Sequence, residues 1–262
     1  MRKTDWHIHS DFSDGQLSVE EIVRKAQQLG LQSIAITDHF DPYDRSLRNR
    51  TAGEDELLRH FDRIRRAGSS SSIEVFAGIE TGSDMDGSMR LSERILSQCD
   101  IVICSPHYLD LEKEGRSVFD AEYWSHYKTL LLKQASNAGD VLGHPEGYLP
   151  APGLEGTTFA QRQEIRAEIA EKFLDEAFYR QLGTLLAESG KAFELHGASG
   201  TPRQWVVELL ADLGVCFSIG SDAHDEAFLG KNDRAWRLAE EKELKIKNPL
   251  GKRRFEICKE SR

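Results

Sequence analysis

Residues 192–224, AFELHGASGTPRQWVVELLADLGVCFSIGSDAH, contain the pattern that decides the fold class. Two apolar runs, Ala192–Leu195 and Cys216–Gly220, have the length of buried strands in a parallel sheet. Between them, the segment from Thr201 to Gln204 has the form of a helix start with Pro at the first helical position, and Gly214 marks the helix end. A strand, a helix and a second strand in this order predict a βαβ unit.

The same alternation of apolar runs and helix-like segments extends along most of the chain. Ser18-Val19-Glu20-Glu21 has the pattern of a capping box, and Gly30 closes the helix that it begins. Seven strands in βα alternation favour an α/β fold in one domain, a closed or nearly closed parallel barrel. An open, doubly wound sheet is the alternative. The five strands predicted besides the first two are Asp5–His9, Ser33–Thr37, Ile73–Glu80, Asp100–Ser105 and Asp140–Gly143.

Length and charge narrow the class of protein. We expect residues 1–242 to form the barrel and residues 243–262 to form a basic tail, packed or partly frayed. Asp and Glu outnumber Lys and Arg by 44 to 34, and the net charge of −10 argues against nucleic acid or a membrane surface as partner. No apolar run approaches the roughly 18 residues of a membrane span.

The N-terminus lacks the apolar stretch of a signal peptide. The four cysteines show no paired or metal-like spacing. A cytoplasmic protein with reduced cysteines is therefore expected, while the sequence leaves the oligomeric state open.

Histidines gather at the ends of the predicted strands. Because the carboxyl ends of parallel barrel strands meet at one face, most of these side chains are expected to lie together. Imidazole and carboxylate groups together suit zinc, manganese or iron, and a cluster this rich could hold two or three ions. His60 and His126 lie in helical segments and are interpreted as surface or helix-packing residues. The strand-end histidines are His7, His9, His39, His107, His144, His196 and His224, accompanied by Asp14, Asp38, Glu80 and Asp222.

Each motif alone also has a structural interpretation. Thr37-Asp38-His39 and His144-Pro145 are compatible with turns in which the histidine is only hydrogen-bonded, and Glu80 with a solvated strand end. The segment Gly220–His224 is a stronger signal, because two types of ligand stand two residues apart after an apolar strand. The joint occurrence of the motifs favours a metal site.

Taken in order, these motifs resemble those of the polymerase-and-histidinol-phosphatase (PHP) family. The resemblance covers residues 5–230 and implies a distorted seven-stranded (β/α)7 barrel, similar to a TIM barrel, with three divalent metal ions (Zn, Mn or Fe) that hydrolyse phosphoesters. Residues 104–110 and the chain length are similar to the histidinol-phosphate phosphatase branch, which implies a place in histidine biosynthesis. The matching segments are His7-Ile8-His9-Ser10 with Asp14-Gly15, Ile36-Thr37-Asp38-His39, Gly78-Ile79-Glu80, Ser105-Pro106-His107, Gly143-His144-Pro145 and Gly220-Ser221-Asp222-Ala223-His224.

The resemblance also implies a set of metal ligands. The first ion would be held by His7, His9, Glu80 and Asp222. Glu80 would bridge to a second ion, held also by His107 and His144. The third ion would be held by Asp14, His39 and His224, with Asp14 at a position where the family often has His.

Two positions depart from the family pattern. His196 stands where the family often has Asn, and an extra ligand, a substrate contact and a proton donor are its three candidate roles. The arginine-bearing segment expected after Gly143-His144 is replaced by Glu146-Gly147-Tyr148 and a Pro/Gly loop over residues 145–156, which we expect to shape the substrate pocket.

These expectations define a phosphatase. A metal-activated hydroxide would hydrolyse a small phosphate monoester, with L-histidinol phosphate as the candidate substrate and L-histidinol as the product. Asp38 is expected to orient a ligand histidine or to assist proton transfer, and His196 is the other catalytic candidate. A phosphodiesterase or exonuclease acting on nucleotides, and a non-catalytic regulatory module that binds metal, are the alternatives. Candidates for binding the phosphate are Arg45, Arg48, Arg50 and Arg90.

Overall fold

The computed structural model describes residues 3–41, 53–107, 109–154 and 156–248. Within these ranges seven parallel strands form one sheet, with each strand beside the next one in the chain. The predicted α/β architecture is confirmed. The strands are β1 (Thr4–Asp5), β2 (Ser33–Ile36), β3 (Glu74–Thr81), β4 (Ile101–Cys104), β5 (Val141–Leu142), β6 (Ala192–His196) and β7 (Cys216–Gly220).

The first and last strands meet, so the sheet is nearly closed into a barrel. The backbone N–H of Trp6 donates to the Ile219 carbonyl at 3.0 Å. The carboxylate of Asp5 accepts hydrogen bonds from Ser221 Oγ at 2.6 Å and from the Gly230 N–H at 2.9 Å. This closure rules out the open, doubly wound alternative.

Strand β1 is shorter than the predicted Asp5–His9. Beyond Asp5 the chain makes isolated bonds to both neighbours in place of a continuous ladder. Ile8 bridges to Ala223 on the β7 side, and its carbonyl accepts from the Thr37 N–H after β2. His7 and His9 therefore lie just past the strand, at the mouth of the barrel.

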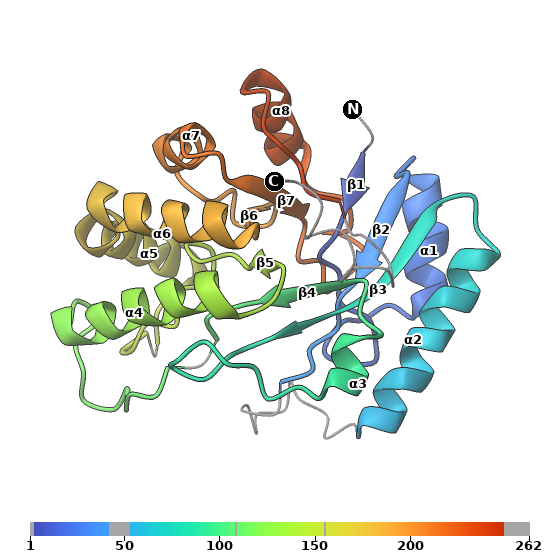
Figure 1. The fold of residues 1–262 in the computed structure, drawn as a ribbon, viewed down its shortest axis with the longest axis horizontal. Helices are drawn as coiled ribbons and strands as arrows, with labels where there is room; N and C mark the ends of the chain where they lie inside the picture. Colours follow the sequence, from blue (N-terminus) through green and yellow to red (C-terminus); the bar gives the residue numbers. More distant parts are fainter. Residues whose placement is uncertain (1–2, 42–52, 108, 155, 249–262) are drawn as a thin grey trace.

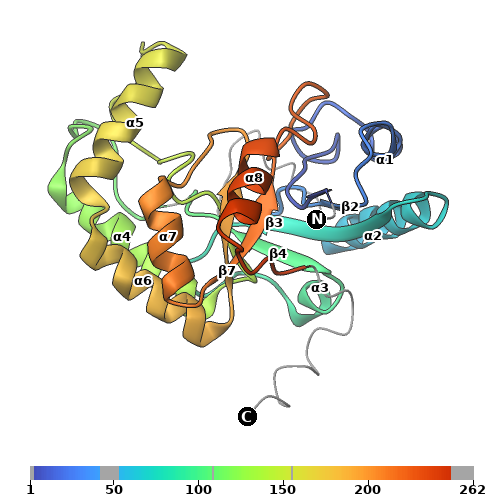
Figure 2. The same cartoon turned by 90° about the horizontal axis from the view of Figure 1, so that it is seen from above.

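Eight helices surround the strands in the described part of the chain. Helices α1 and α2 lie on one side, and α4, α5 and α6 lie on the other (Figure 1). Seen from above, α5 extends beyond the end of the barrel (Figure 2). The helices are α1 (Val19–Gln28), α2 (Glu54–Ser69), α3 (Glu93–Leu96), α4 (Ala121–Asn137), α5 (Phe159–Phe173), α6 (Glu176–Ser189), α7 (Gln204–Asp212) and α8 (Asp233–Glu241).

One predicted helix start is confirmed and one is wrong. Ser18 caps α1 in a capping box, because its hydroxyl accepts from the Glu21 N–H and its own N–H donates to Glu21 Oε2 at 2.9 Å. Helix α7 begins later than predicted, at Gln204. Thr201 is not its cap, since the Thr201 carbonyl accepts from the His196 N–H at 2.9 Å and its hydroxyl bonds Ser199 Oγ at 2.7 Å.

Apolar side chains fill the interior of the barrel. Ile246 packs against them from the start of the C-terminal segment, where Lys245 and Lys247 exchange backbone hydrogen bonds with Phe217 of β7. Residues 249–262, the rest of the predicted tail, lie outside the described residues. No helix in the described ranges is both long and apolar enough to cross a bilayer. The interior residues are Trp6, Ala35, Ile101, Ile103, Val141 and Ala192.

Candidate metal centre

Seven histidines lie close together at the mouth of the barrel, at the carboxyl ends of the strands, with the carboxylates of Asp14, Glu80, Glu194 and Asp222. The predicted convergence of the strand ends is therefore what the structure shows. Two groups share His9, and we call them the inner and the outer group. The inner group is His7, His9, Glu80 and Asp222, and the outer group is His9, Asp14, His39 and His224.

The inner group is fully buried. One ligand atom from each of its four residues lies within 4.8 Å of the others. Asp222 Oδ1 is 3.0 Å from His9 Nε2 and 3.4 Å from His7 Nε2. Glu80 Oε2 lies 3.4 Å from each of the same two nitrogens.

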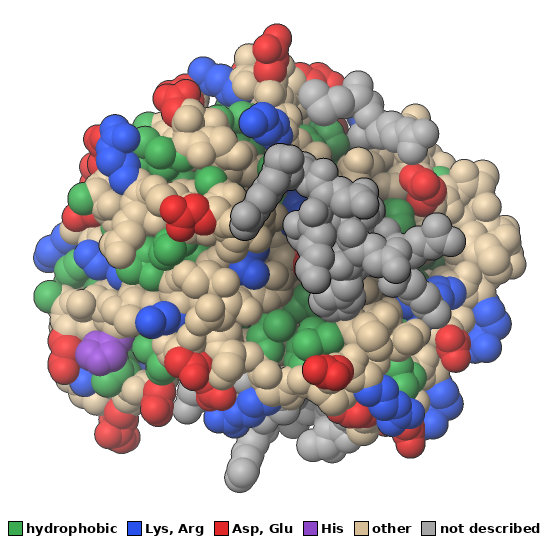
Figure 3. Space-filling view, in the orientation of Figure 1, with side chains coloured by type: hydrophobic (Ala, Val, Ile, Leu, Met, Phe, Trp, Pro, Cys, Tyr) green, Lys and Arg blue, Asp and Glu red, His purple; other side chains and the backbone are tan. Residues whose placement is uncertain are grey.

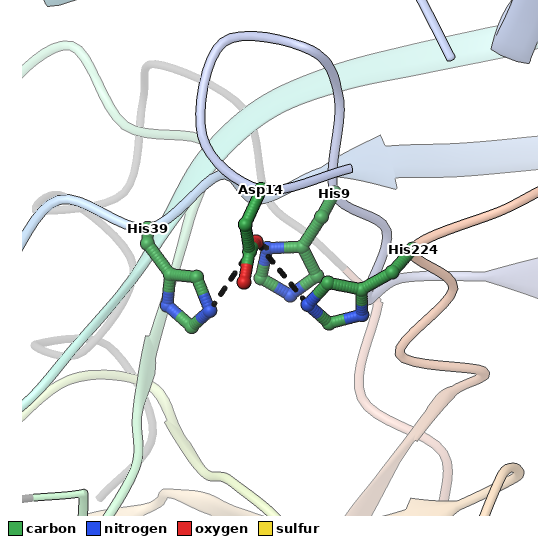
Figure 4. Close-up of side chains that lie close together, drawn as sticks. All are labelled: His9, Asp14, His39 and His224. Carbon is green, nitrogen blue, oxygen red and sulfur yellow. Dashed lines mark ion pairs between the residues drawn. The ribbon is translucent and has the colours of Figure 1, made fainter. Parts of the chain in front are cut away.

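The outer group opens toward solvent. Its four side chains turn toward one another around Asp14, which projects from the loop after β1 (Figure 4). Asp14 Oδ1 is 3.2 Å from His224 Nε2, 3.6 Å from His39 Nε2 and 3.8 Å from His9 Nδ1. The side chains of His224 and Asp14 are 38% and 23% exposed, whereas those of the inner group lie below 5%.

Glu80 belongs to the inner group and also contacts His39 of the outer group. Its Oε2 is 3.1 Å from His39 Nδ1. Its Oε1 is 2.8 Å from His144 Nε2 and 3.3 Å from His107 Nε2. A carboxylate that faces several donors in this way has the placement of a bridging ligand.

The polar atoms of this centre fit metal ions. Five buried atoms make no hydrogen bond in the described part of the chain, and all but His144 Nδ1 face other potential ligand atoms. Burying polar atoms without partners is costly, and ligation removes that cost. Imidazole and carboxylate donors suit zinc, manganese and iron. The atoms are His7 Nε2, His9 Nδ1, His9 Nε2, His144 Nδ1 and Asp222 Oδ1.

In the absence of ions, the electrostatics hold the carboxylates and His39 in the forms that ligands need, whereas neighbouring carboxylates outweigh burial and raise the pKa of His7, His107 and His224. Burial raises the pKa of Glu80, but the charges of His107 and His7 outweigh burial and hold this pKa well below its usual value. For Asp222 burial acts in the same direction and is outweighed by His7 and by the bond from His196. Burial lowers the pKa of His39 to about 3, against the attraction of Glu80. Ionised carboxylates and a neutral imidazole are the forms that bind metal.

Glu194 belongs to the centre and was missed by the sequence analysis. Its Oε1 accepts from His7 Nδ1 at 2.7 Å, and its Oε2 accepts from the His144 N–H at 2.8 Å. The first bond fixes the His7 tautomer and leaves Nε2 facing the inner group. The second holds His144 at a φ of 25°, a left-handed conformation uncommon for a histidine. A glutamate inside an apolar strand, AFELH, was the available signal.

Gly220 makes room for this arrangement. A Cβ at this position would lie 2.3 Å from His7 Cβ and 2.6 Å from Glu194 Oε1. Only glycine therefore allows β7 to approach the two side chains so closely.

The two predicted catalytic residues lie behind the centre. His196 is buried, with Nε2 3.1 Å from Asp222 Oδ2 and Nδ1 2.6 Å from Ser199 Oγ. Asp38 is fully buried and accepts hydrogen bonds from Ser10 and His60. Neither side chain lines the cleft above the centre. Both positions suit a residue that positions a ligand.

A cleft of about 550 Å³ opens above both groups. Tyr148 and Pro150 line it, so the long loop after β5 does shape this pocket. The cations along its wall are Lys113 and Arg166, the latter from α5. Arg90 pairs with Asp84 at 2.7 Å on the surface and does not line the cleft. The other three predicted phosphate contacts, Arg45, Arg48 and Arg50, lie outside the described residues.

Comparisons with known proteins bear on these residues. The family described as "PHP domain" matches residues 5–185. The chain is 23% identical to a probable histidinol-phosphatase of Thermotoga maritima over 235 residues, which are 87% of this chain and 86% of that protein. It is 28% identical over 154 residues, 56% of this chain, to the DNA polymerase/3'-5' exonuclease PolX of Bacillus subtilis. The match spans only 24% of that polymerase.

The fold has a solved counterpart. The histidinol phosphate phosphatase of Lactococcus lactis, crystallised with zinc, L-histidinol and phosphate, superposes with a TM-score of 0.68. The match covers 96% of this chain and 97% of that one at 21% identity, and so shows a shared fold.

Proposed function

This chain belongs to the PHP domain family, and from that premise we propose that its metal centre hydrolyses a small phosphate monoester, with L-histidinol phosphate as the first candidate. The chain is a hydrolase of phosphoric esters. The observation that carries the proposal is the inner group, in which buried donor atoms of His7, His9 and Asp222 face one another without hydrogen bonds.

The proposed ligands of two ions come from the inner and outer groups, and a further ion would lie between His107 and His144, which both face Glu80 Oε1. His7, His9, Glu80 and Asp222 would hold the first ion. His107, His144 and Glu80 would hold the second, and Asp14, His39 and His224 the third. Divalent ions in such a centre supply an activated water and neutralise charge on the phosphoryl oxygens.

The chain's own residues would hold this machinery in place. Glu194 fixes the His7 ring, and His196 bonds the Asp222 oxygen that faces away from His9. We therefore assign His196 a positioning role, because its two ring nitrogens are already engaged and its ring does not reach the cleft.

Arg166 is our proposed phosphate contact. Its Nε is buried and has no hydrogen-bond partner among the described residues. Burial lowers its pKa, yet an arginine stays charged in a protein. Its guanidinium carbon lies 5.4 Å from the centre of the Tyr148 ring, which itself contacts His144 edge-on at 5.5 Å. A charged donor without a partner beside a metal centre suits an anionic oxygen. Lys113 lines the same cleft.

The rest of the cleft suits a flat, cationic leaving group. Tyr148 and Phe228 are 39% and 42% exposed, and both line the cleft. The carboxylate of Asp225 lies on the same wall. Exposed aromatic rings next to a carboxylate can hold a ring and an ammonium group. L-histidinol phosphate carries both.

A nuclease activity is the second candidate, because the similarity to PolX covers 154 residues. Nucleic-acid binding draws on clustered positive charge. On the face shown in Figure 3, basic and acidic side chains are interspersed, and the net charge is −10. The phosphatase therefore fits better.

The test is phosphate release from L-histidinol phosphate, p-nitrophenyl phosphate and a dinucleotide, using protein reloaded with Mn²⁺ or Zn²⁺. We expect efficient turnover of L-histidinol phosphate that disappears when the metal is stripped and returns when it is restored. H126A is the matched control, since His126 is a partly exposed histidine of α4 that bonds only its own helix. Preferred cleavage of the dinucleotide would replace the phosphatase by a nuclease. Metal binding without turnover of any substrate would indicate a regulatory module.

A further inference from the structure

The buried carboxylate of Asp38 bonds the loop after β1, which carries Asp14 of the outer group. Asp38 is fully buried and accepts four hydrogen bonds. Its Oδ1 accepts from the Ser10 N–H at 2.7 Å and from Ser13 Oγ at 2.6 Å. Its Oδ2 accepts from Ser10 Oγ at 2.6 Å and from His60 Nε2 at 2.7 Å. The carboxylate therefore ties the turn after β1 to the end of β2 and to helix α2.

Three residues of this network, Ser10, Ser13 and Asp38, each adjoin a residue of the outer group. Ser10 follows His9, Ser13 precedes Asp14, and Asp38 precedes His39. His224, the fourth residue of the outer group, is bonded to the same loop, because the Gln16 N–H donates to the His224 carbonyl at 2.8 Å. A displacement of the loop would move Asp14 relative to all three histidines.

His60 anchors the network to the body of the protein. It lies on the buried face of α2, between Leu57 and Phe61. Its ring stacks on Phe12, with ring centres 4.1 Å apart and planes 9° apart. The Phe12 N–H in turn donates to Ser10 Oγ at 3.2 Å. One histidine thus holds the loop by a charged hydrogen bond and by ring packing.

We propose that His60, acting through Asp38, is a positioning residue that sets the affinity of the outer ion alone. The inference rests on the metal centre of the proposed function. The inner group has its own support, because Glu194 of β6 bonds His7 and His196 bonds Asp222. Only His9 belongs to both groups, and its Nε2 faces Asp222 and Glu80 at the end of β1. Loss of His60 therefore loosens the outer group and leaves the inner one in place.

Two variants separate the contributions of His60. H60F keeps a ring for Phe12 and removes the donor to Asp38. H60Q keeps an amide donor near the position of Nε2 and removes the ring. H126F is the matched control on α4. Each full-length protein is dialysed against buffers of graded free Mn²⁺, and bound metal per chain is measured by plasma mass spectrometry, with the melting temperature recorded in parallel.

We expect H60F to lose one ion at a free Mn²⁺ concentration about 10- to 100-fold higher than the concentration at which the wild type loses it. A change of this size is typical when a residue behind a ligand is removed. The other ions should be retained as in the wild type, and H60Q should restore most of the lost affinity. Equal weakening of all ions, or binding identical to the wild type, would overturn the inference.

A second pair of variants locates the ion. D14A should lose the same ion, and D14A/H60F should bind no less metal than D14A. Additional metal loss in the double variant would contradict an effect confined to the outer group. A wild-type protein that binds neither Mn²⁺ nor Zn²⁺ would overturn the proposed function itself. Metal-dependent turnover with an unchanged H60F profile would overturn only this inference.

Discussion

The inner and outer groups of the centre use the same ligand types but differ in what supports them. The inner group stands at strand ends, is buried, and is braced by Glu194 from inside the barrel. The outer group depends on a loop, is partly exposed, and is braced by Asp38 from outside the barrel. The inner ion should therefore be fixed and the outer ion exchangeable, so that substitutions in the two groups should have different consequences.

The D222N variant should have the largest effect, and it tests the assignment of Asp222 to the inner group. Asp222 contacts both inner histidines, and an amide removes the charge that holds a cation there. Hydrolysis should fall by more than the roughly 100-fold upper range for residues behind metal ligands, while circular dichroism stays that of the wild type. An active variant with its full complement of metal would refute the inner assignment.

H224A should remove the outer ion and leave the inner group filled. We expect turnover to fall by about 10²- to 10³-fold, the cost of losing one group that stabilises charge in the transition state. The measurement is kcat together with metal per chain. A loss as complete as that of D222N, with all metal gone, would show that the groups are not independent.

E194Q tests the support of the inner group. Glutamine has one acceptor oxygen, so it can satisfy only one of the two N–H groups that Glu194 now accepts. The affinity for the inner ion should fall by about 10- to 100-fold, with the outer ion unaffected at saturating inner metal. Metal titration followed by mass spectrometry measures both. Selective loss of the outer ion would show that Glu194 supports the outer group and not the inner one.

R166M should leave both groups filled and change only substrate binding. Loss of a charged hydrogen bond costs about 1.5–3 kcal/mol, so KM for the phosphate ester should rise by roughly 10- to 100-fold with a smaller change in kcat. R162M is the control on the same helix, because Arg162 bonds Thr157 on the exposed side. A KM equal to that of the wild type would exclude Arg166 as the phosphate contact.

The sequence predicted the strands and the ligand cluster because both are local patterns. Apolar runs such as Cys216–Gly220 and the polar residues that follow them can be located without knowing their partners. Glu194 could not be assigned in this way, since its bond to His7 joins residues 187 positions apart. Arg166 reaches the cleft only because α5 lies beside the mouth of the barrel.

The sequence around His60 predicts its burial but not its hydrogen-bond partner. Its place in the apolar spacing of Leu57, Phe61 and Ile64 predicts a buried position, and the structure confirms helix packing. The apolar spacing could not predict the bond from His60 to Asp38, because that bond depends on how α2 packs against the loop after β1.

Closure of the barrel has a consequence for biosynthesis. The bonds from Ser221 to Asp5 bring the beginning of the chain to a segment made more than 200 residues later. A nascent chain emerges from the ribosome with its N-terminus first. His7 and His9 are therefore made before the six strands β2 to β7, and Asp222 is made after them. The inner group cannot be completed co-translationally until that residue is exposed, and metal capture then becomes a late step that marks a finished barrel.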